Sequence, residues 1–572
     1  MRNKYNNLYL DDNPLEDVPL QEYPRMQFKR ASYLCLNGLW DVEITKSKEL
    51  PTKYFSQVIV PFPIESKLSK VNKELKKGEY IYYRRFFNIS KSFNVGRIIL
   101  HFDGIDQISD VYINGKLVMH HEGGYLPFEV DITNCIKKEN EKYELVVKVQ
   151  DDLNKMYGYG KQAIKSKGMW YTKTSGIWKT CWIESVPNKY FKNIKIDTTL
   201  DEVTIKVNGD ILKKQIIIFS ENKKQIYRFK SEEIKIKIKN PNNWTPNNPY
   251  LYKFILKGED DCVESYFALR TIKVGEFQGY PCLLLNDKPY FFNGLLDQGY
   301  YPDGLLTPKT YKKYEDEINV VKKLGFNTLR KHIKVETDYF YYLCDKLGMI
   351  VFQDFVNNGS YNYLTDTILP NIGLTKRLKK GFTTRNIIKE QFKKEAKETI
   401  AMLYNHPSVV YYTIFNEGWG QFSTKKVTDF IHRLDPSRLV DSASGWFDQG
   451  CGDINSLHYY FLGLPVPESD RVLALSEFGG YSLRLPEHSA CRNIYGYKKF
   501  TTSEALTDGF SRLMENTIVP SVKKGYSATV FTQLSDIEEE TNGLITYDRK
   551  KIKMNPLIVQ KWNTKLKKSL HS

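Results

Sequence analysis

The 572-residue sequence predicts a multidomain fold in which two all-β sandwiches precede a (β/α)8 TIM barrel. Up to about residue 278, short apolar segments alternate with polar and turn residues, a pattern typical of sandwich strands. Beyond that point, longer apolar runs are separated by amphipathic segments, as expected for a parallel barrel. The chain is long enough for three such units, because a barrel takes about 250 residues and a smaller domain about 100–200.

We assign residues 1–187 to the first sandwich. Its clearest strand-like segments are residues 97–101, 111–113, 143–149 and 178–183. Asn114-Gly115 lies between two apolar runs, and this dipeptide is a strong signal for a tight β-hairpin. These features predict an antiparallel sandwich.

Residues 188–278 form the second predicted sandwich. The alternation continues in residues 203–207, 215–219 and 234–238, and no helical pattern interrupts it. A short segment of this kind is typical of an immunoglobulin-like sandwich. We interpret the Pro/Asn-rich residues 240–249 as a structured loop between strands.

Residues 279–572 contain the runs expected for a barrel. The predicted strands are residues 290–293, 326–330, 349–354, 409–415, 439–442, 454–458, 471–475 and 528–533. They are continuous apolar runs, as expected of strands buried on both faces. Between the first two, residues 310–324 predict a helix that ends at Gly325, a residue suited to a C-terminal cap.

Two glutamates follow predicted barrel strands and carry most of the functional signal. Glu417 follows the fourth strand in an Asn-Glu-Gly sequence, and Glu477 follows the seventh. The carboxyl ends of barrel strands form the active-site rim. Two carboxyl groups about 5–5.5 Å apart are what retaining glycoside hydrolysis requires. The alternative, that each is a salt-bridged structural glutamate, is weakened because both follow buried strands.

Charge and cysteine content bear on other classes of function. The formal net charge of +17 raises the question of an anionic partner, but the lysines are spread along the chain and no nucleic-acid-binding motif is present. We therefore expect no nucleic-acid partner. The eight cysteines show neither a C-x-x-C pair nor zinc-ligand spacing, so we expect free thiols and no metal.

No apolar run approaches the roughly 20 residues of a membrane-spanning helix. The first residues are polar and lack the apolar core of a signal peptide. We therefore expect a cytoplasmic protein with no membrane partner. Nothing in the sequence separates an interface from sandwich packing, so a homo-oligomer remains open.

Eight further segments are informative when they are considered together with the two glutamate motifs. They are Leu36–Trp40, Gly104–Asp106, Val111–Gly115, Thr174–Thr180, Phe267–Ile272, Leu285–Tyr290, Gly325–His332 and Tyr342–Gly348. With these segments the chain resembles glycoside hydrolase family 2, which belongs to a clan of retaining (β/α)8 glycosidases, over essentially its whole length. The resemblance implies a jelly-roll sugar-binding-like domain in residues 1–187, an immunoglobulin-like domain in 188–278 and a catalytic barrel in 279–572.

The resemblance also implies roles for individual residues. Glu417 matches the family's acid/base and Glu477 its nucleophile. Asn416 would hydrogen-bond the sugar 2-hydroxyl, and Arg330 would keep the nucleophile ionised through its opposite charge. No cofactor is implied by a mechanism that uses two carboxylates.

Five other residues are candidates for substrate binding because they lie at predicted strand ends or in the loops that follow. They are His332, Asp354, Trp446, His458 and Tyr459. Polar and aromatic side chains there would meet sugar hydroxyls and ring faces. The alternatives are that Trp446 packs within its loop and that His458 is a core histidine satisfied by backbone groups.

The substrate sugar is less well defined. Glucuronidases of the family carry an Asn-x-Lys motif near the last strand, and the corresponding residues 540–549 lack it. Glu540 in that segment would repel a uronate, so the resemblance favours a neutral sugar, with galactose first and mannose and arabinose-type sugars next. The resulting hypothesis is a retaining exo-β-glycosidase of the β-galactosidase type. A β-mannosidase, a β-glucuronidase and a non-catalytic carbohydrate-binding protein are the alternatives.

Overall fold

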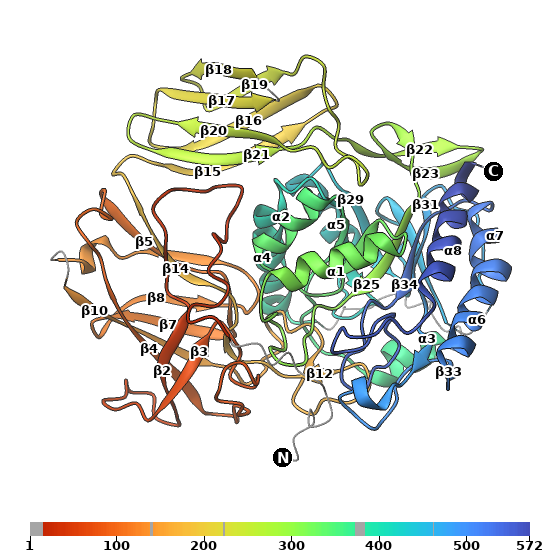
Figure 1. Cartoon of the computed structure of the whole chain (residues 1–572), viewed down its shortest axis with the longest axis horizontal. Coiled ribbons are helices and arrows are strands. Elements are labelled where there is room, and N and C mark those ends of the chain that lie inside the picture. Colours follow the sequence, from red (N-terminus) through yellow and green to blue (C-terminus); the bar gives the residue numbers. More distant parts are fainter. Residues whose placement is uncertain (1–14, 138–140, 221–222, 372–383, 461–462, 572) are drawn as a thin grey trace.

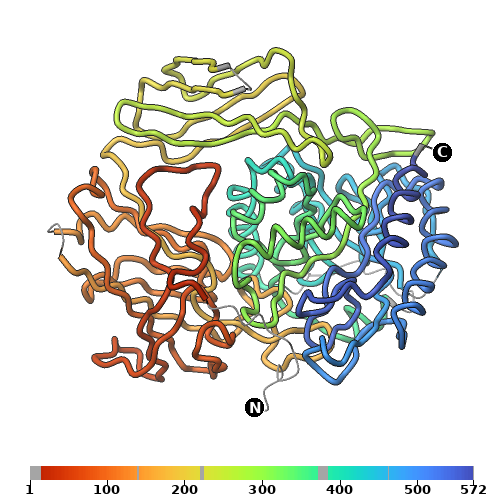
Figure 2. The backbone as a smooth tube through the Cα atoms, in the orientation of Figure 1, coloured from red at the N-terminus to blue at the C-terminus, as the bar shows by residue number. Residues whose placement is uncertain are grey.

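The computed structural model describes residues 15–137, 141–220, 223–371, 384–460 and 463–571. The first sandwich lies at the left of Figure 1, the second lies across the top, and the barrel lies at the right. Figure 2 traces the chain from the first sandwich into the second and then into the barrel. Both sandwiches contact the barrel. The backbone N of Tyr159 donates to Asn357 O over 3.1 Å, and that of Ile196 donates to Asn405 Oδ1 over 2.8 Å.

The first sandwich consists mainly of two antiparallel sheets. The larger sheet has the order β3 (Ser56–Val60), β2 (Gly38–Thr45), β4 (Tyr80–Asn88), β10 (Lys142–Gln150), β7 (Ile108–Ile113) and β8 (Lys116–Glu122). The smaller has the order β1 (Leu34–Cys35), β14 (Cys181–Val186), β5 (Arg97–Phe102) and β9 (Phe128–Asp131). Alternate residues of both sheets form one buried core.

The predicted hairpin at Asn114-Gly115 is confirmed. It joins β7 to β8, and both residues have positive φ, +49° and +76°, as a two-residue turn of this type requires. The strand expected at residues 178–183 starts only at Cys181. The preceding residues turn away because Trp178 Nε1 donates to Gly124 O over 2.7 Å and Lys179 Nζ donates to Tyr125 O over 2.6 Å.

The second sandwich also has two sheets. One has the order β15 (Phe191–Thr198), β16 (Glu202–Gly209) and β19 (Glu233–Lys237). The other has the order β18 (Lys223–Phe229), β17 (Lys214–Ser220), β20 (Tyr252–Lys257) and β21 (Cys262–Phe267). The three predicted strands of this segment are confirmed as β16, β17 and β19.

Eight parallel strands form the barrel, and each overlaps a predicted strand, although the first, expected at residues 290–293, begins at Phe292 and runs on to Asp297. Their order is β29-β28-β27-β26-β25-β34-β31-β30. Their bounds are β25 (Phe292–Asp297), β26 (Thr328–Lys331), β27 (Ile350–Asp354), β28 (Val409–Asn416), β29 (Leu439–Ser444), β30 (Ile454–Tyr459), β31 (Val472–Gly479) and β34 (Tyr526–Thr532). Most are buried along their whole length, which explains why continuous apolar runs identified them.

Helices cover the outside of the barrel in Figure 1. They are α1 (Lys312–Lys323), α2 (Asp338–Leu347), α3 (Leu369–Asn371), α4 (Asn386–Leu403), α5 (Thr424–Leu434), α6 (Ser503–Leu513), α7 (Val519–Val522) and α8 (Pro556–Lys568). The predicted helix at residues 310–324 is confirmed as α1, and Gly325 follows it with φ of +86°. Among the described residues, no helix has the length and apolar character needed to cross a membrane.

The predicted alternation of strand and helix fails on one side of the barrel. Described residues 445–453, between β29 and β30, contain no helix, and neither do residues 463–471 before β31. The first connection is short and contains three glycines with positive φ, Gly445, Gly450 and Gly452. At this side, side chains link the strands: Ser456 Oγ of β30 donates to Asp441 Oδ2 of β29 over 2.7 Å.

A small sheet covers the floor of the barrel. It consists of β22 (Ile272–Phe277), β23 (Tyr280–Leu285) and β24 (Lys288–Pro289), and its apolar residues share a core with the barrel strands. The predicted structured loop at residues 240–249 supplies Trp244 to the same core. Trp244 is fully buried, and its Nε1 donates to Asp345 O of α2 over 2.8 Å.

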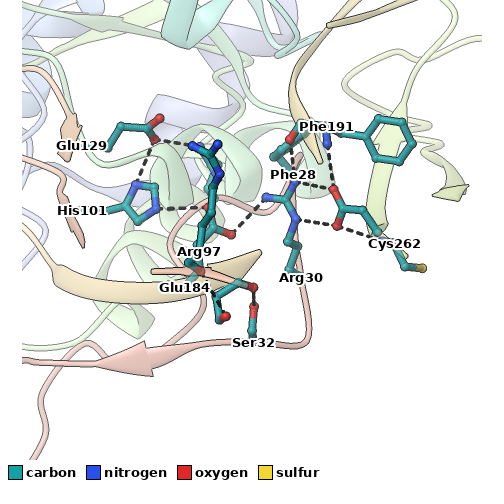
Figure 3. Close-up of polar contacts among 12 residues, drawn as sticks. Phe28, Arg30, Ser32, Arg97, His101, Glu129, Glu184, Phe191 and Cys262 are labelled. Carbon is teal, nitrogen blue, oxygen red and sulfur yellow. Dashed lines mark hydrogen bonds and ion pairs between the residues drawn. The ribbon is translucent and has the colours of Figure 1, made fainter. Parts of the chain in front are cut away.

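A network of charged residues, buried except at Glu129, joins the two sandwiches (Figure 3). Arg30 donates to Asp261 of the second sandwich from Nε over 2.9 Å and from Nη2 over 2.8 Å, and its Nη1 donates to Glu184 of β14 over 3.1 Å. His101 of β5 lies between Glu129 and Glu184, at 3.2 and 3.1 Å. The network fixes the first sandwich against the second, and thus the position from which it reaches the barrel.

Candidate active site

The two predicted catalytic glutamates lie at the carboxyl ends of their barrel strands. Glu417 directly follows β28, and Glu477 lies near the end of β31. Both residues are buried, with 8% and 5% of their surface exposed. They therefore lie at the rim where active sites of TIM barrels are found.

Local backbone irregularities orient both carboxylates. Glu417 has φ of +49°, in the left-handed region, and its backbone N donates to Ser444 O over 2.9 Å. In β31 the register toward β30 shifts so that Leu457 pairs with Leu475 and His458 with Glu477, which leaves Ser476 as an extra residue. Strained residues and β-bulges recur beside active sites because they redirect side chains.

The ring of His458 lies between the two carboxylates. Its Nδ1 is 2.9 Å from Glu417 Oε1, and its Nε2 is 3.5 Å from Glu477 Oε1. One nitrogen of His458 and one oxygen of each glutamate all lie within 4.8 Å of one another. This spacing suits a retaining glycosidase, whose carboxyl groups are about 5–5.5 Å apart, better than an inverting one, at about 6.5–9.5 Å.

Arg330 of β26 connects three of the predicted site residues. Its Nε donates to Asp354 Oδ1 and its Nη1 to Glu477 Oε1, both over 3.0 Å. Its Nη2 donates to Asn416 Oδ1 over 2.9 Å. The planar guanidinium thus holds Asn416 and Glu477 in a fixed relation while it is itself held by Asp354.

The charges around Glu477 keep its carboxylate ionised. Burial alone would raise the pKa of Glu477, but the positive charges of His458 and Arg330 and a hydrogen bond from Tyr460 bring it down to about 2. Burial likewise acts to raise the pKa of Asp354, and Arg330 and His332 hold it below its usual value. A low pKa is what a nucleophilic carboxylate needs at neutral pH.

His332 pairs with Asp354, which also accepts a hydrogen bond from Arg330. His332 Nδ1 is 2.8 Å from Asp354 Oδ2, and Asp354 has no exposed surface. The burial of His332 lowers its pKa despite this carboxylate. Because Asp354 faces Arg330 and His332, the structure places it as a residue that positions Arg330, not as one open to a sugar.

The structure bears on the alternative roles considered for His458 and Trp446. His458 is not a core histidine satisfied by backbone, because its neighbours are the side chains of both glutamates and of Ser444, whose Oγ is 3.1 Å from Nε2. Trp446 is half-buried, with its ring edge-on to His458 at 5.4 Å between centroids. Trp446 therefore lies beside His458 and is partly exposed to solvent.

Tyr459 is placed differently from the prediction. It packs against the apolar core that fills the space between strands and helices. The next residue, Tyr460, has the position expected for Tyr459, and its Oη donates to Glu477 Oε2 over 2.5 Å. The two tyrosines are adjacent in the sequence, so only the register of β30 decides which one faces the site.

Lys161, from the first sandwich, was not predicted. Only 7% of its surface is exposed, and its Nζ lies 5.8 Å from the ring centroid of Trp419 and 5.7 Å from that of Tyr171. Its charge helps lower the pKa of His332, after burial as the main cause. Among the described residues, no carboxylate pairs with its ammonium group. No local pattern marks Lys161, because it reaches the site only through domain packing.

Glu540, predicted to repel a uronate, is buried among polar partners. Its carboxylate accepts hydrogen bonds from the Tyr171 hydroxyl and, over 3.0 Å, from Asn542 Nδ2. Asn542 is itself held by Gln533, whose Nε2 donates to Asn542 Oδ1 over 2.7 Å. The negative charge of Glu540 is therefore partly compensated inside the protein.

Glu417, His458 and Glu477 also form a group with the donor atoms of a metal site. Sequence spacing could not show this group, because its members come from three different strands. A metal ion there would replace the contacts of His458 with both carboxylates and compete with Arg330 for Glu477. The same contacts suit proton transfer and nucleophilic attack, and a two-carboxylate mechanism requires no metal.

Solved structures share this architecture. A β-D-glucuronidase from Dictyoglomus thermophilum superposes with a TM-score of 0.75 at 18% identity, covering 94% of this chain and 98% of that one. A β-galacturonidase from Eisenbergiella tayi, bound to galacturonate, gives a TM-score of 0.69 at 16% identity and covers 95% and 99%. At these identities the likeness establishes the fold alone.

Curated relatives match by sequence. A β-galactosidase from Thermoanaerobacter pseudethanolicus is 25% identical over 383 residues, which are 62% of this chain and 47% of that protein. A β-glucuronidase from Streptococcus agalactiae is 23% identical over 415 residues, 67% of this chain and 66% of that protein. The chain thus spans about half the length of the first relative and two thirds of the second.

Three family models match successive parts of the chain. The sugar binding domain of glycosyl hydrolases family 2 matches residues 27–187, the central family 2 model matches residues 185–270, and the family 2 TIM barrel domain matches residues 281–471. The three matches follow the order of the two sandwiches and the barrel. Together with the paired glutamates, they show that the chain belongs to glycosyl hydrolases family 2.

Proposed function

We propose that this protein is a retaining β-glycosidase that removes a terminal β-linked sugar by double displacement. The observation that carries the proposal is the spacing of Glu417 and Glu477, which contribute carboxylate oxygens within 4.8 Å of each other and of His458. The low pKa of Glu477 supports its assignment as the nucleophile.

In the first step Glu477 attacks the anomeric carbon, and the bond to the glycosidic oxygen breaks. Glu417 donates its proton to that oxygen, so the leaving group departs as a neutral alcohol. The sugar is then held as an ester on Glu477. His458, between the two carboxylates, holds Glu417 toward the leaving oxygen.

In the second step Glu417 acts as a base. It takes a proton from a water molecule, whose oxygen attacks the anomeric carbon and releases the Glu477 carboxylate. Two inversions give net retention. Glu417 ends protonated and Glu477 ionised, which restores the starting state.

Asn416 is placed to bind the sugar. Its Oδ1 accepts a hydrogen bond from Arg330 Nη2, and among the described residues none accepts from its Nδ2. The amide is therefore fixed with its donor free, which suits a hydroxyl next to the anomeric carbon. Such contacts strengthen as charge develops in the transition state.

A neutral β-galactoside is the first candidate substrate. Glu540 places a carboxylate in the loop after the last strand, and the relative from Thermoanaerobacter is named β-galactosidase. A β-uronide is the second candidate, and Lys161 favours it. A buried ammonium group without a carboxylate partner is suited to receive the carboxylate of a uronic acid.

The test is a panel of p-nitrophenyl β-glycosides (galactoside, mannoside, glucoside, glucuronide and galacturonide) with wild type, Glu417→Gln and Glu477→Gln. We expect release from one glycoside and its loss in both variants, while Glu276→Gln, at an exposed position of β22, retains it. NMR of the first-formed sugar should show the β-anomer. Formation of the α-anomer, or activity that survives in Glu477→Gln, would refute the mechanism.

Lys161 distinguishes the two candidate sugars. If the substrate is a uronide, Lys161→Met should lower kcat/KM for it about 10- to 100-fold, because a hydrogen bond to a charged group contributes about 1.5–3 kcal/mol. Lys161→Arg should restore part of this loss, and activity on a neutral glycoside should change little. An equal loss on neutral and acidic glycosides would assign Lys161 a structural role.

A further inference from the structure

A cavity of about 860 Å³ lies where the first sandwich meets the barrel. Four parts of the chain line it: residues 153–170 of the first sandwich, residues 361–363 after β27, residues 493–495 after β31, and Glu539 after β34. Tyr159, Trp170, Tyr361, Tyr363 and Tyr495 give it an aromatic lining. No role described above uses this cavity.

The aromatic wall of the cavity packs against Trp419, which follows Glu417 by two residues. Trp419 is buried behind the cavity wall and stacks on Trp170 at 5.3 Å between ring centroids. Tyr361 meets Trp419 edge-on, also at 5.3 Å, and Trp170 at 4.8 Å. Burial is the main cause of the raised pKa of Tyr361 and of Tyr495, and the negative charge of Glu417 adds to it in both cases. The cavity is thus on the side of the acid/base residue.

The polar groups of the lining are largely engaged within the protein. Gln162 Nε2 donates to Asp106 Oδ2 over 2.8 Å, and its Oε1 accepts from the backbone N of Thr174 over 2.8 Å. Glu539 accepts from the backbone N of Gly168 over 2.9 Å and from Asn493 Nδ2 over 3.0 Å. These contacts leave few acceptors for the hydroxyls of a second sugar.

Apolar groups extend to the rim of the cavity. Ile164 is 65% exposed, Tyr363 57% and Ile494 39%. Exposed apolar side chains clustered around an aromatic cavity mark a binding site for apolar ligands. Lys165 and Lys167 lie on the same segment and are exposed, which suits a ligand that also carries an acidic or phenolic group.

We propose that this cavity is the leaving-group site of the glycosidase and that it takes a flat aromatic aglycone, stacked on Trp170 and bordered by Tyr361 and Tyr495. The proposal rests on the proposed function, because Glu417 protonates the oxygen that joins sugar to leaving group, and the leaving group must therefore lie on the side of Glu417. The natural substrates are then aryl β-glycosides, not oligosaccharides.

The proposal is tested by steady-state kinetics on glycosides of the sugar that gives the highest activity in the panel. kcat/KM is measured for its 4-methylumbelliferyl and methyl glycosides in wild type, Trp170→Ala and Phe55→Ala. For each substrate, kcat/KM of a variant is divided by that of wild type, so the different reactivity of the two leaving groups cancels. We expect Trp170→Ala to lower kcat/KM for the aryl glycoside at least tenfold and for the methyl glycoside less than threefold. Phe55, 79% exposed and absent from the cavity lining, serves as the matched aromatic control. An equal loss on both substrates would overturn the proposal.

Binding gives a readout that does not depend on catalysis. Titration of 4-methylumbelliferone into wild type, Trp170→Ala and Phe55→Ala, followed by fluorescence or calorimetry, should show binding at least tenfold weaker in Trp170→Ala alone. The absence of any dependence on Trp170, or tighter Trp170-dependent binding of lactose, would overturn the aromatic assignment. A silent glycoside panel with Trp170-dependent binding intact would refute the proposed function and leave the aromatic cavity standing.

Discussion

At the residue scale, one arginine organises the candidate catalytic centre. Arg330 has no exposed surface and donates hydrogen bonds to Asp354, Asn416 and Glu477. A buried charge of this kind is tolerated because every side of the guanidinium meets an acceptor. Its role was expected from the family resemblance, and the structure adds Asp354 as the group that holds it in place.

Arg330→Lys is expected to shift the acidic limb of the pH profile of kcat/KM to higher pH. A lysine ammonium cannot contact three acceptors in one plane, so less positive charge faces Glu477 and the pKa of its carboxylate rises. The nucleophile is then protonated over a wider acidic range. The measurement is kcat/KM against pH on the best p-nitrophenyl glycoside.

Arg471→Lys is the matched control for this experiment. Arg471 lies just before β31 and pairs with Asp448, with Nη2 and Oδ2 2.6 Å apart, at the opposite end of the strand from Glu477. Its replacement should leave the acidic limb in place. An unchanged limb in Arg330→Lys as well would show that the other partners of Glu477, among them His458 and Tyr460, suffice to depress its pKa.

At the element scale, the barrel strands were predictable and their irregularities were not. Continuous apolar runs identified all eight strands because burial on both faces selects for such runs. The extra residue at Ser476 and the left-handed backbone of Glu417 depend on pairing with β30 and β29. A one-residue change of register moves a side chain to the other face, which explains why Tyr460 and not Tyr459 contacts Glu477.

The hairpin between β7 and β8 offers a test of local backbone conformation. Gly115 has φ of +76°, and a Cβ there would meet no atom within 4 Å. Gly115→Ala is therefore expected to lower the free energy of unfolding by about 1 kcal/mol through backbone strain alone, measured by chemical denaturation. Gly463→Ala also adds a methyl group in open space, but without a positive φ, and should have no destabilising effect. Equal losses in both variants would argue against strain as the cause.

At the scale of the whole molecule, the sandwiches are held by buried charge and by one tryptophan. Glu184 accepts from Arg25 and Arg30 and lies beside His101. Burial acts to raise the pKa of Glu184, but these three partners lower it to about 2. Because the folded state lowers this pKa below its usual value of 4.5, the carboxylate stabilises the fold above about pH 4.5. That stabilisation is lost as pH falls toward 2.

Glu184→Gln should therefore cost about 3–5 kcal/mol of unfolding free energy at neutral pH, since it removes the buried carboxylate shared by Arg25, Arg30 and His101, which keep only Asp261 and Glu129 as acidic partners. The difference from wild type should narrow as pH falls from 4.5 toward 2, which denaturant titrations at several pH values can measure. Glu202→Gln breaks the more exposed pair with Lys235 and should cost less than about 1 kcal/mol. A pH-independent loss in Glu184→Gln would mean that packing and not charge is responsible.

Trp244 ties the second sandwich to the barrel floor. Its side chain is fully buried among barrel residues, and its Nε1 bonds to α2. Trp244→Ala is expected to destabilise the protein by about 3–5 kcal/mol and to separate the unfolding of sandwich and barrel in calorimetry.

Two variants serve as controls for this experiment. Trp244→Phe should retain part of the packing, and Phe55→Ala should change stability by less than about 0.5 kcal/mol. A single transition of unchanged midpoint in Trp244→Ala would show that other contacts couple the domains.

The sequence by itself determined most of the elements and predicted the chemistry. Apolar periodicity identified sandwich strands, barrel strands and α1, and two glutamates after buried strands predicted a hydrolytic site, because these signals are local or lie within one repeating unit. The tertiary structure decided which groups meet. His458 between the two carboxylates, Tyr460 on Glu477, and Lys161 and Trp170 from the first sandwich come from separate strands or domains. No local pattern encodes such contacts, because strand register and domain packing alone set the distances between them.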